Sequence, residues 1–268
     1  MSDYHIGFMG FGHMAQVIFS ALDRAKIIPR SQVLFLRRDR AKMKENEQKF
    51  GITATGLPNL VEKSDLIFLC MRPQQAETAL LELKGMGNLE GKKLITIIAG
   101  KPIAFYQKHL GQEIQMVRAM PNIASSVMEG MTILTYGPGV SSEFKSITHL
   151  LFSSLGQIAE VKEDLCDRTT AMAGSGPGFV FCLIEAMARF GEQGGLSYQE
   201  ALKMAAQVFA GASQLILKGQ MPTDLIAQIA TPNGITQTGL DVMAKHEMEK
   251  QFHLVLEAAM RKSREFQK

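Results

Sequence analysis

Three small residues near the start of the chain, Gly10, Gly12 and Ala15, have the spacing of a loop that binds phosphate groups. They follow an apolar run over residues 5–9 and lead into a helical pattern. In the G-x-G-x-x-A pattern the first glycine permits a tight turn, and the second leaves room for a pyrophosphate. Free amides at the start of the following helix then bind the phosphate oxygens. A plain turn between strand and helix has the same composition, so the surrounding elements must decide.

Two arginines, Arg37 and Arg38, come directly after the second apolar run, Val33–Leu36. An NAD site usually has Asp or Glu here, which binds the ribose hydroxyls. A guanidinium is permanently charged and can bond two phosphate oxygens at once, so the pair favours the 2′-phosphate of NADP. A solvated charged loop is the alternative, and Asp39 leaves NAD open. The sequence therefore favours NADPH, with NADH as the second choice.

Short apolar runs alternate with helical patterns over the first part of the chain, which positions the loop. Because strands that alternate with helices form parallel sheets covered on both faces, an α/β, Rossmann-like doubly wound domain is predicted. The glycine loop then follows its first strand, which is the context that a dinucleotide site requires. The expected strands are residues 5–9, 33–36, 66–71, 94–99, 115–117 and 131–136, and the expected helices include 15–25, 42–50, 75–83 and 143–155.

After about residue 162 the strand signals end and the chain reads as helix. Ser197 and Glu200 form a capping box, Pro222 suits a helix start, and residues 231–235 interrupt the pattern. We therefore expect a dinucleotide-binding domain over residues 1–162 and an all-α domain over residues 163–268. Small residues of one long helix let another helix approach closely. Composition leaves open whether that helix packs on the first domain or on a partner chain; the small residues are Ala201, Ala205, Gly211 and Ala212.

Composition argues against several other classes of protein. The net charge of +3 and the absence of a long basic run argue against nucleic acid as a partner. Three well-separated cysteines and six histidines show no metal-binding spacing, so we expect no metal and reduced, buried thiols in a cytoplasmic protein. The apolar run over residues 171–188 contains Gly-Ser-Gly-Pro and Glu185, so a buried helix is expected rather than a membrane span. The first residues show no basic leader.

Several stretches then form a set: "LCMRPQQ", "RAMPNIASSVMEGMT", "TAMAGSGPGFVFCLIEAMA" and "TPNGITQTGL". In order and spacing they resemble the pyrroline-5-carboxylate reductase family, from about residue 6 to about residue 265. The resemblance implies NAD(P)H-dependent reduction of 1-pyrroline-5-carboxylate to L-proline, the last step of proline biosynthesis. It also implies that the helical domain serves dimerisation and substrate binding, since two such domains interleave in a homodimer. Larger homo-oligomers follow, with a decamer of dimers as one such assembly. The active site would lie between the nicotinamide end of a cofactor domain and the helices of the dimer core.

The resemblance also implies roles for individual residues. Thr236 matches the threonine that bonds the substrate nitrogen, although a simple helix N-cap is the structural alternative for it. The substrate carboxylate would be held by the amides of Gly234, Ile235 and Thr236, with help from the Thr231 hydroxyl, and Asn122 would lie near the substrate. The remaining matches are to cofactor-binding positions, namely Met9, Gly10, Phe11, Gly12, His13, Met14, Arg37, Arg38, Asn59, Met71, Arg72, Pro73, Ala99, Met120 and Pro121.

The expected chemistry needs little acid–base machinery, because a protonated imine is already electrophilic and positioning carries most of the burden. Three departures from the family pattern, Asn233, Gly219 and Ala244, bear on which imine is preferred. Asn tolerates a left-handed backbone, so the loop shape should survive at Asn233. Two other functions fit these motifs: reduction of a related cyclic imine acid, and cofactor binding by a non-catalytic regulatory protein. A 2-hydroxy acid dehydrogenase fits less well, since no matching loop offers a lysine or histidine for an alcohol proton.

Overall fold

The computed structural model describes residues 4–87 and 89–267. The chain forms two compact units, of which the first comprises Met1–Ser175 with Ala259–Lys268 and the second Gly176–Ala258. This division differs from the one expected after residue 162. The difference arises because residues 163–175 belong with the sheet, and because the end of the last helix belongs to the first unit.

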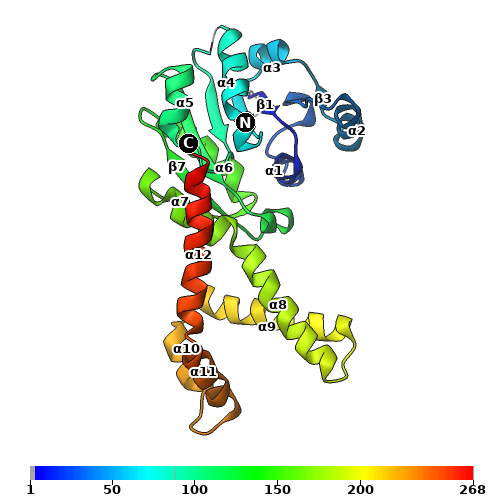
Figure 1. Ribbon diagram of the computed structural model, residues 1–268. Coiled ribbons are helices and arrows are strands. Elements are labelled where there is room, and N and C mark those ends of the chain that lie inside the picture. The colour runs from blue at the N-terminus through cyan, green and yellow to red at the C-terminus, as the bar shows by residue number, and fades with distance from the viewer. Residues whose placement is uncertain (1–3, 88, 268) are drawn as a thin grey trace. The chain divides into compact units, whose positions relative to one another are not determined.

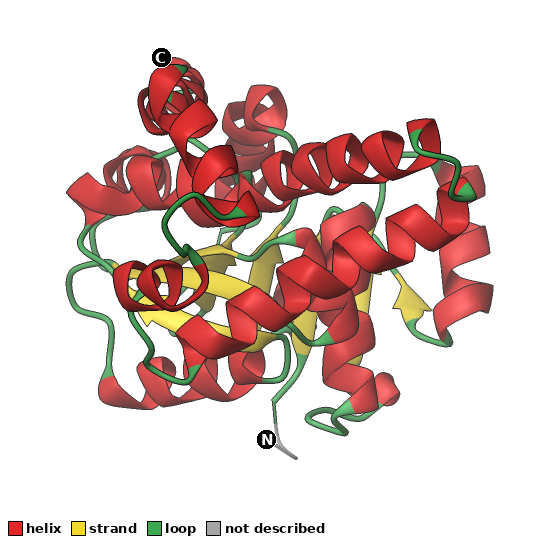
Figure 2. Ribbon diagram, turned by 90° about the horizontal axis from the view of Figure 1, so that it is seen from below, coloured by secondary structure: helices red, strands yellow, loops and turns green. Residues whose placement is uncertain are grey.

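The first unit is built on one eight-stranded sheet, whose strands lie side by side (Figure 2). The strand order is β3-β2-β1-β4-β5-β6-β7-β8, so the chain turns back at the boundary between β1 and β4. This is the doubly wound order in which ligands bind outside the carboxyl ends of the strands, at the turning point. The strands are β1 (Ile6–Met9), β2 (Val33–Leu36), β3 (Thr53–Ala54), β4 (Leu66–Leu69), β5 (Lys93–Thr96), β6 (Gln115–Met120), β7 (Gly130–Tyr136) and β8 (Gly156–Glu160).

One strand pair departs from the expected parallel arrangement. β6 and β7 pair antiparallel, with Val117 opposite Tyr136 and Met120 opposite Ile133. Only a short 3-10 helix, Ile123–Val127, joins them, and a parallel pairing would need a crossover of a dozen or more residues. The connection is too short for that, so β7 reverses direction. β8 then runs parallel to β7.

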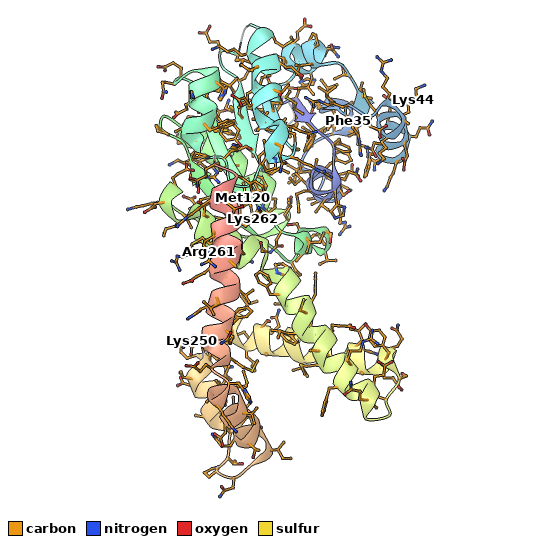
Figure 3. All side chains as sticks on the ribbon, viewed as in Figure 1. Phe35, Lys44, Met120, Lys250, Arg261 and Lys262 are labelled. Atoms are coloured by element: carbon orange, nitrogen blue, oxygen red, sulfur yellow. The ribbon has the colours of Figure 1, made fainter. Side chains whose placement is uncertain are left out.

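Helices cover both faces of this sheet (Figure 1). Because side chains alternate along a strand, Phe8 and Phe68 pack on one face and Ile67 and Leu69 on the other. The first face meets α1 (His13–Arg24) and α6 (Ser142–Ser153). The second meets α3 (Leu57–Lys63), α4 (Ala76–Gly85) and α5 (Ile103–Leu110). Helix α2 (Arg40–Phe50) is mostly polar and packs on the core through Met43 and Phe50. Its Lys44 points away from the domain, whereas Phe35 lies within it (Figure 3).

The second unit consists of helices alone. They are α8 (Gly176–Gln193), α9 (Tyr198–Leu217), α10 (Pro222–Ile229), α11 (Ile235–Lys245) and the greater part of α12 (Met248–Glu265). The predicted capping box begins α9: the Glu200 amide donates to Ser197 Oγ, and the Ser197 amide donates to Glu200 Oε2. Pro222 stands in the first turn of α10, as its fixed φ favours.

Helices α8 and α9 approach closely where both carry small residues. A Cβ added to Gly191 would lie 2.9 Å from the Cβ of Ala201, so the contact requires glycine. Ala201 and Ala205 are buried, together with Ala188 of α8. These alanines are therefore covered within the chain, by α8. Gly211 and Ala212 further along α9 remain exposed.

Helix α8 is not the buried helix that its sequence suggested. Ala188 is the one buried residue of α8. Phe181 and Phe190 are 57% and 79% exposed, and Cys182 is exposed too, although a buried thiol was expected there. The run Glu163–Gln193 is long and apolar enough to cross a membrane by length and composition, and 17% of its most apolar window is buried. An apolar helix with little cover inside one chain can equally be covered by a second copy.

The end of α12 is anchored in the first unit by Asp167. This carboxylate accepts hydrogen bonds from Ser263 Oγ at 2.8 Å and from Gln267 Nε2 at 2.7 Å. Phe266 lies against Gly100, whose φ is +75° and whose added Cβ would come within 2.5 Å of the Phe266 Cβ. The last turn of α12 thus packs on the loop that follows β5.

Candidate cofactor site and substrate loop

A pocket of about 620 Å³ opens at the carboxyl edge of the sheet, at the turning point of the strand order. Its volume is within the range typical of small-molecule sites. Loops that follow β1, β2 and β4 form its walls, joined by one face of α4. The lining residues are Met9, Gly10, Phe11, Gly12, Leu36, Arg37, Arg38, Asp39, Leu57, Cys70, Met71, Arg72, Gln75, Ala79 and Glu82.

The glycine loop has the geometry that its sequence predicted. Gly10 has a φ of +94°, and a Cβ there would come within 2.8 Å of the Cys70 carbonyl oxygen, so only glycine fits. Gly12 is the N-cap of α1 and would place a Cβ in open space, with no atom within 4 Å. Ala15 is buried against the sheet. The open cradle at Gly12 and the unpaired amides of the first turn of α1 therefore fit the pyrophosphate of a dinucleotide.

Both predicted arginines line the pocket, but they have different partners. Arg37 Nη1 donates to the Phe11 carbonyl oxygen at 2.9 Å, which ties the end of β2 to the glycine loop. Arg38 Nη2 lies 3.5 Å from Glu82 Oε1 of α4. Asp39 accepts from the Lys42 amide at 3.1 Å, so its carboxylate caps α2. The acidic residue that left NAD open is thus engaged in starting a helix.

The thiol in the pocket lining, that of Cys70, is unreactive. Burial raises the pKa of the Cys70 thiol, so it stays protonated and is a poor nucleophile. Among the described residues, no group of three His, Cys, Asp or Glu side chains is placed to hold a metal ion. The pocket therefore offers a binding surface of amides and guanidinium groups.

Some residues expected at the cofactor site lie elsewhere or have other partners. Asn59 lies outside the pocket lining, and its amide nitrogen donates to Thr55 Oγ1 at 2.6 Å. His13 faces a different hollow beside α1, and Met14 packs on the core. Pro73 begins a 3-10 helix, Pro73–Gln75, next to the pocket.

The residues expected near the nicotinamide lie at or just beyond the ends of β5 and β6. Ala99 stands in a turn three residues beyond β5, which ends at Thr96, so it does not end that strand as expected. Met120 is buried at the end of β6, and Pro121 follows it. Asn122 Nδ2 donates to the Ala173 carbonyl oxygen at 3.0 Å, and its Oδ1 accepts from the Ala124 amide at 3.1 Å. Both polar atoms of the Asn122 side chain thus have hydrogen-bond partners within the chain.

Residues on α4 and at its start were missed at the sequence level although they line the pocket. Ala79 and Glu82 of α4 and its N-cap Gln75 are spaced four and three residues apart, so they share one face. The helical pattern was recognised, but which face meets the cofactor depends on how α4 packs on the sheet. The helical periodicity could have shown that these residues share one face of the helix. Only the fold shows that this face lines the pocket.

The loop before α11 belongs to the second unit, and it forms a tight turn at the start of the helix. Asn233 adopts a φ of +59°, so the left-handed position expected of a glycine is kept by asparagine. The Gly234 amide donates to the Thr231 carbonyl oxygen at 2.9 Å, which corrects the expectation that this amide is free for a carboxylate. Gly234 is the N-cap of α11, so Thr236 is not the N-cap that the structural alternative required.

Free donors remain in the first turn of α11. Among the described residues, the amides of Ile235 and Thr236 have no backbone acceptor, as the first turn of any helix leaves them. Ile235 is 96% exposed and Thr236 is exposed too, so these donors are accessible in the chain. A carboxylate would be favoured there by both the amides and the helix dipole.

Two family models match separate parts of the chain. The model for pyrroline-5-carboxylate reductase dimerisation matches residues 163–266, and that for NADP oxidoreductase, coenzyme F420-dependent, matches residues 5–100. The first covers the helices whose apolar faces are exposed, and the second covers the glycine loop and the arginine pair.

Curated relatives match along nearly the whole chain. Pyrroline-5-carboxylate reductase 1 of Bacillus subtilis is 31% identical over 265 residues, covering 97% of this chain and 88% of the relative. Pyrroline-5-carboxylate reductase of Methanosarcina acetivorans is 31% identical over 270 residues, covering 100% of both. The crystal structure of Plasmodium falciparum pyrroline carboxylate reductase with NADP bound is 28% identical, with a TM-score of 0.91 over 100% of both chains.

Proposed function

This chain belongs to the pyrroline-5-carboxylate reductase family, and we propose that it reduces 1-pyrroline-5-carboxylate to L-proline with NADPH. It is an oxidoreductase that acts on a C=N bond, with a Rossmann-like domain that takes NAD(P)H and an all-α dimerisation domain. The observation that carries the proposal is the pocket at the turning point of the sheet. It combines a glycine turn, free amides of α1 and two arginines in one wall.

We propose the following roles for the residues of the cofactor pocket. Gly10 and Gly12 let the backbone approach the pyrophosphate, and the first-turn amides of α1 bind its oxygens. Arg37 and Arg38 bind the 2′-phosphate, since Asp39 is engaged as a helix cap. When bound, NADPH supplies the hydride that reduces the imine carbon. Ala99, Met120 and Pro121 remain the proposed neighbours of the nicotinamide.

We propose that the loop before α11 recognises the substrate. The amides of Ile235 and Thr236 hold the carboxylate, and the Thr231 hydroxyl adds a donor. The Thr236 hydroxyl orients the ring nitrogen, accepting from the iminium and donating to the product amine. Positioning of this kind is sufficient because the protonated imine is already electrophilic.

Self-association follows from the matched dimerisation model, and the exposed apolar helices of the second unit support it. We propose a homodimer that builds larger assemblies, with a decamer of dimers as one candidate, and a cytoplasmic location in which the three free cysteines stay reduced. We also propose residue 162 as the functional boundary, because the two matched models end and begin on either side of it, at residues 100 and 163. Neither nucleic acid nor membrane is proposed as a partner.

The test is a turnover assay with purified protein. NADPH absorbance should fall when pyrroline-5-carboxylate is added, and chromatography should show L-proline formed in equal amount. A six-membered cyclic imine acid should react more slowly; the opposite ranking would assign the enzyme to that related imine. Binding of NADPH without turnover of either imine would favour the non-catalytic regulatory function.

Thr236→Ala is the variant that tests the substrate loop. Loss of the hydroxyl that orients the imine should lower kcat at least about 100-fold, the scale of one positioned polar group in a reacting complex, with the Kd of NADPH unchanged. Thr223→Ala, in the first turn of α10, is the matched control, because its hydroxyl lies 3.5 Å from its neighbour Asp224 and is assigned no role. Full activity of Thr236→Ala would remove Thr236 from the mechanism.

A further inference from the structure

We infer that Glu82 sets the preference between NADPH and NADH by competing with the 2′-phosphate for Arg38, an inference that rests on the proposed cofactor. Glu82 projects from α4 into the lining of the cofactor pocket. Its Oε1 lies 3.5 Å from Arg38 Nη2, and the side chains are 49% and 60% exposed. The pocket thus places a carboxylate from α4 next to the guanidinium, beyond β2, that should bind the phosphate.

Two other charged residues of the pocket lining have partners of their own, and Arg72, the third lining arginine, is a cation that does not compete with a phosphate for Arg38. Asp39 caps α2 through the Lys42 amide. Arg37 is tied to the glycine loop through the Phe11 carbonyl oxygen. Glu82 is therefore the lining carboxylate that faces Arg38, and Arg38 is the arginine whose recorded partner is an acid.

The competition affects the two cofactors differently. A 2′-phosphate must displace the carboxylate from Arg38 and is also repelled by it, so Glu82 weakens NADPH. NADH carries hydroxyls at the same ribose, and a carboxylate accepts hydrogen bonds from them, so Glu82 does not weaken NADH. The acid that the Rossmann pattern normally places after the second strand is supplied here from α4, on the opposite wall.

The geometry bounds the size of the effect. Half-exposed ion pairs in solvent are weak and are screened by salt. Removal of the Glu82 charge should therefore tighten NADPH about threefold to tenfold at low ionic strength, and by less at high ionic strength. The affinity for NADH should stay unchanged or fall slightly.

The experiment measures direct binding of NADPH and NADH to the full-length protein, without imine. The chain contains no tryptophan, so titrations follow the fluorescence of the nucleotide itself. Glu82→Gln keeps the size of the side chain and removes its charge. The matched control is Glu77→Gln on the same helix, because Glu77 lies outside the pocket lining and its Oε1 is 3.5 Å from His109 Nε2.

A double-mutant cycle identifies the partner. Glu82→Gln should tighten NADPH in the parent protein and have a clearly smaller effect on it in an Arg38→Ser background, where only the direct repulsion of the phosphate remains. The inference is overturned if Glu82→Gln leaves NADPH unchanged, tightens NADH equally, or acts as strongly without Arg38, and also if Glu77→Gln has the same effect. A parent protein that binds neither nucleotide would overturn the proposed cofactor itself and this inference with it.

Discussion

The two glycines of the cofactor loop should respond in opposite ways to the same substitution. Gly12→Ala places a methyl group in open space, at a backbone φ of −82° and ψ of −171° that any residue adopts. Gly10→Ala forces a left-handed backbone at φ +94° and brings a Cβ within 2.8 Å of the Cys70 carbonyl oxygen. The first change should therefore affect binding and the second folding.

The magnitudes separate the two variants clearly. A strained left-handed residue costs about 1–3 kcal/mol, so Gly10→Ala should lower the free energy of unfolding by about 2 kcal/mol or more. Gly12→Ala should change it by less than about 1 kcal/mol, because a small capping loss is offset by a less flexible unfolded chain. A methyl group over the pyrophosphate site should disrupt one or two charged hydrogen bonds of about 1.5–3 kcal/mol each. At 1.4 kcal/mol per factor of ten, that is a loss of NADPH affinity of at least about tenfold.

The assay pairs urea unfolding with titration of NADPH fluorescence on both variants. If Gly12→Ala binds NADPH as tightly as the parent protein, the pyrophosphate does not lie on this loop and the assignment of the pocket fails. If Gly12→Ala instead unfolds as readily as Gly10→Ala, a side chain at residue 12 clashes with its neighbours and the space around its Cβ is not open.

Two further predictions concern charged groups of the first unit. Changing both Arg37 and Arg38 to Ser should weaken NADPH about tenfold or more and NADH much less, as measured by titration; equal losses would contradict recognition of a 2′-phosphate. Glu163→Gln should lower the free energy of unfolding by about 3–5 kcal/mol, because Arg118 is 2% exposed and its ion pair with Glu163 would be broken. Urea unfolding measures that loss, and a loss below about 1 kcal/mol would show that solvent reaches the guanidinium.

Much of the first unit could be predicted from the sequence because its strands are buried on both faces. Such strands are continuous apolar runs, and β2 was predicted to the residue. Helices α3 and α5 and the two-residue strand β3 were missed, since each is short and its pattern is weak. The reversal of β7 depends on the length of a connection, which strand patterns alone do not show.

The site was predicted where local sequence determines local geometry. The turn at Gly10 and the left-handed Asn233 follow from backbone preferences, and both were expected. The role of Glu82 was missed because it depends on how α4 packs against the end of β2. The commitment of the Gly234 amide to Thr231 was missed for a similar reason, since a turn decides which donors remain free.

The sequence of the second unit could not show whether its apolar helices are buried within one chain or against a second copy. Its apolar helices suggested burial, yet its buried apolar residues within the chain are three alanines, Ala188, Ala201 and Ala205. Alanines bury little surface, so the helices gain little hydrophobic stabilisation inside one chain. Large apolar side chains such as Phe190 and Val208 are 79% and 56% exposed. Hydrophobicity indicates burial but not which chain supplies the covering surface. We therefore expect the dimerisation domain to fold stably only with a second copy, so its stability should rise with protein concentration.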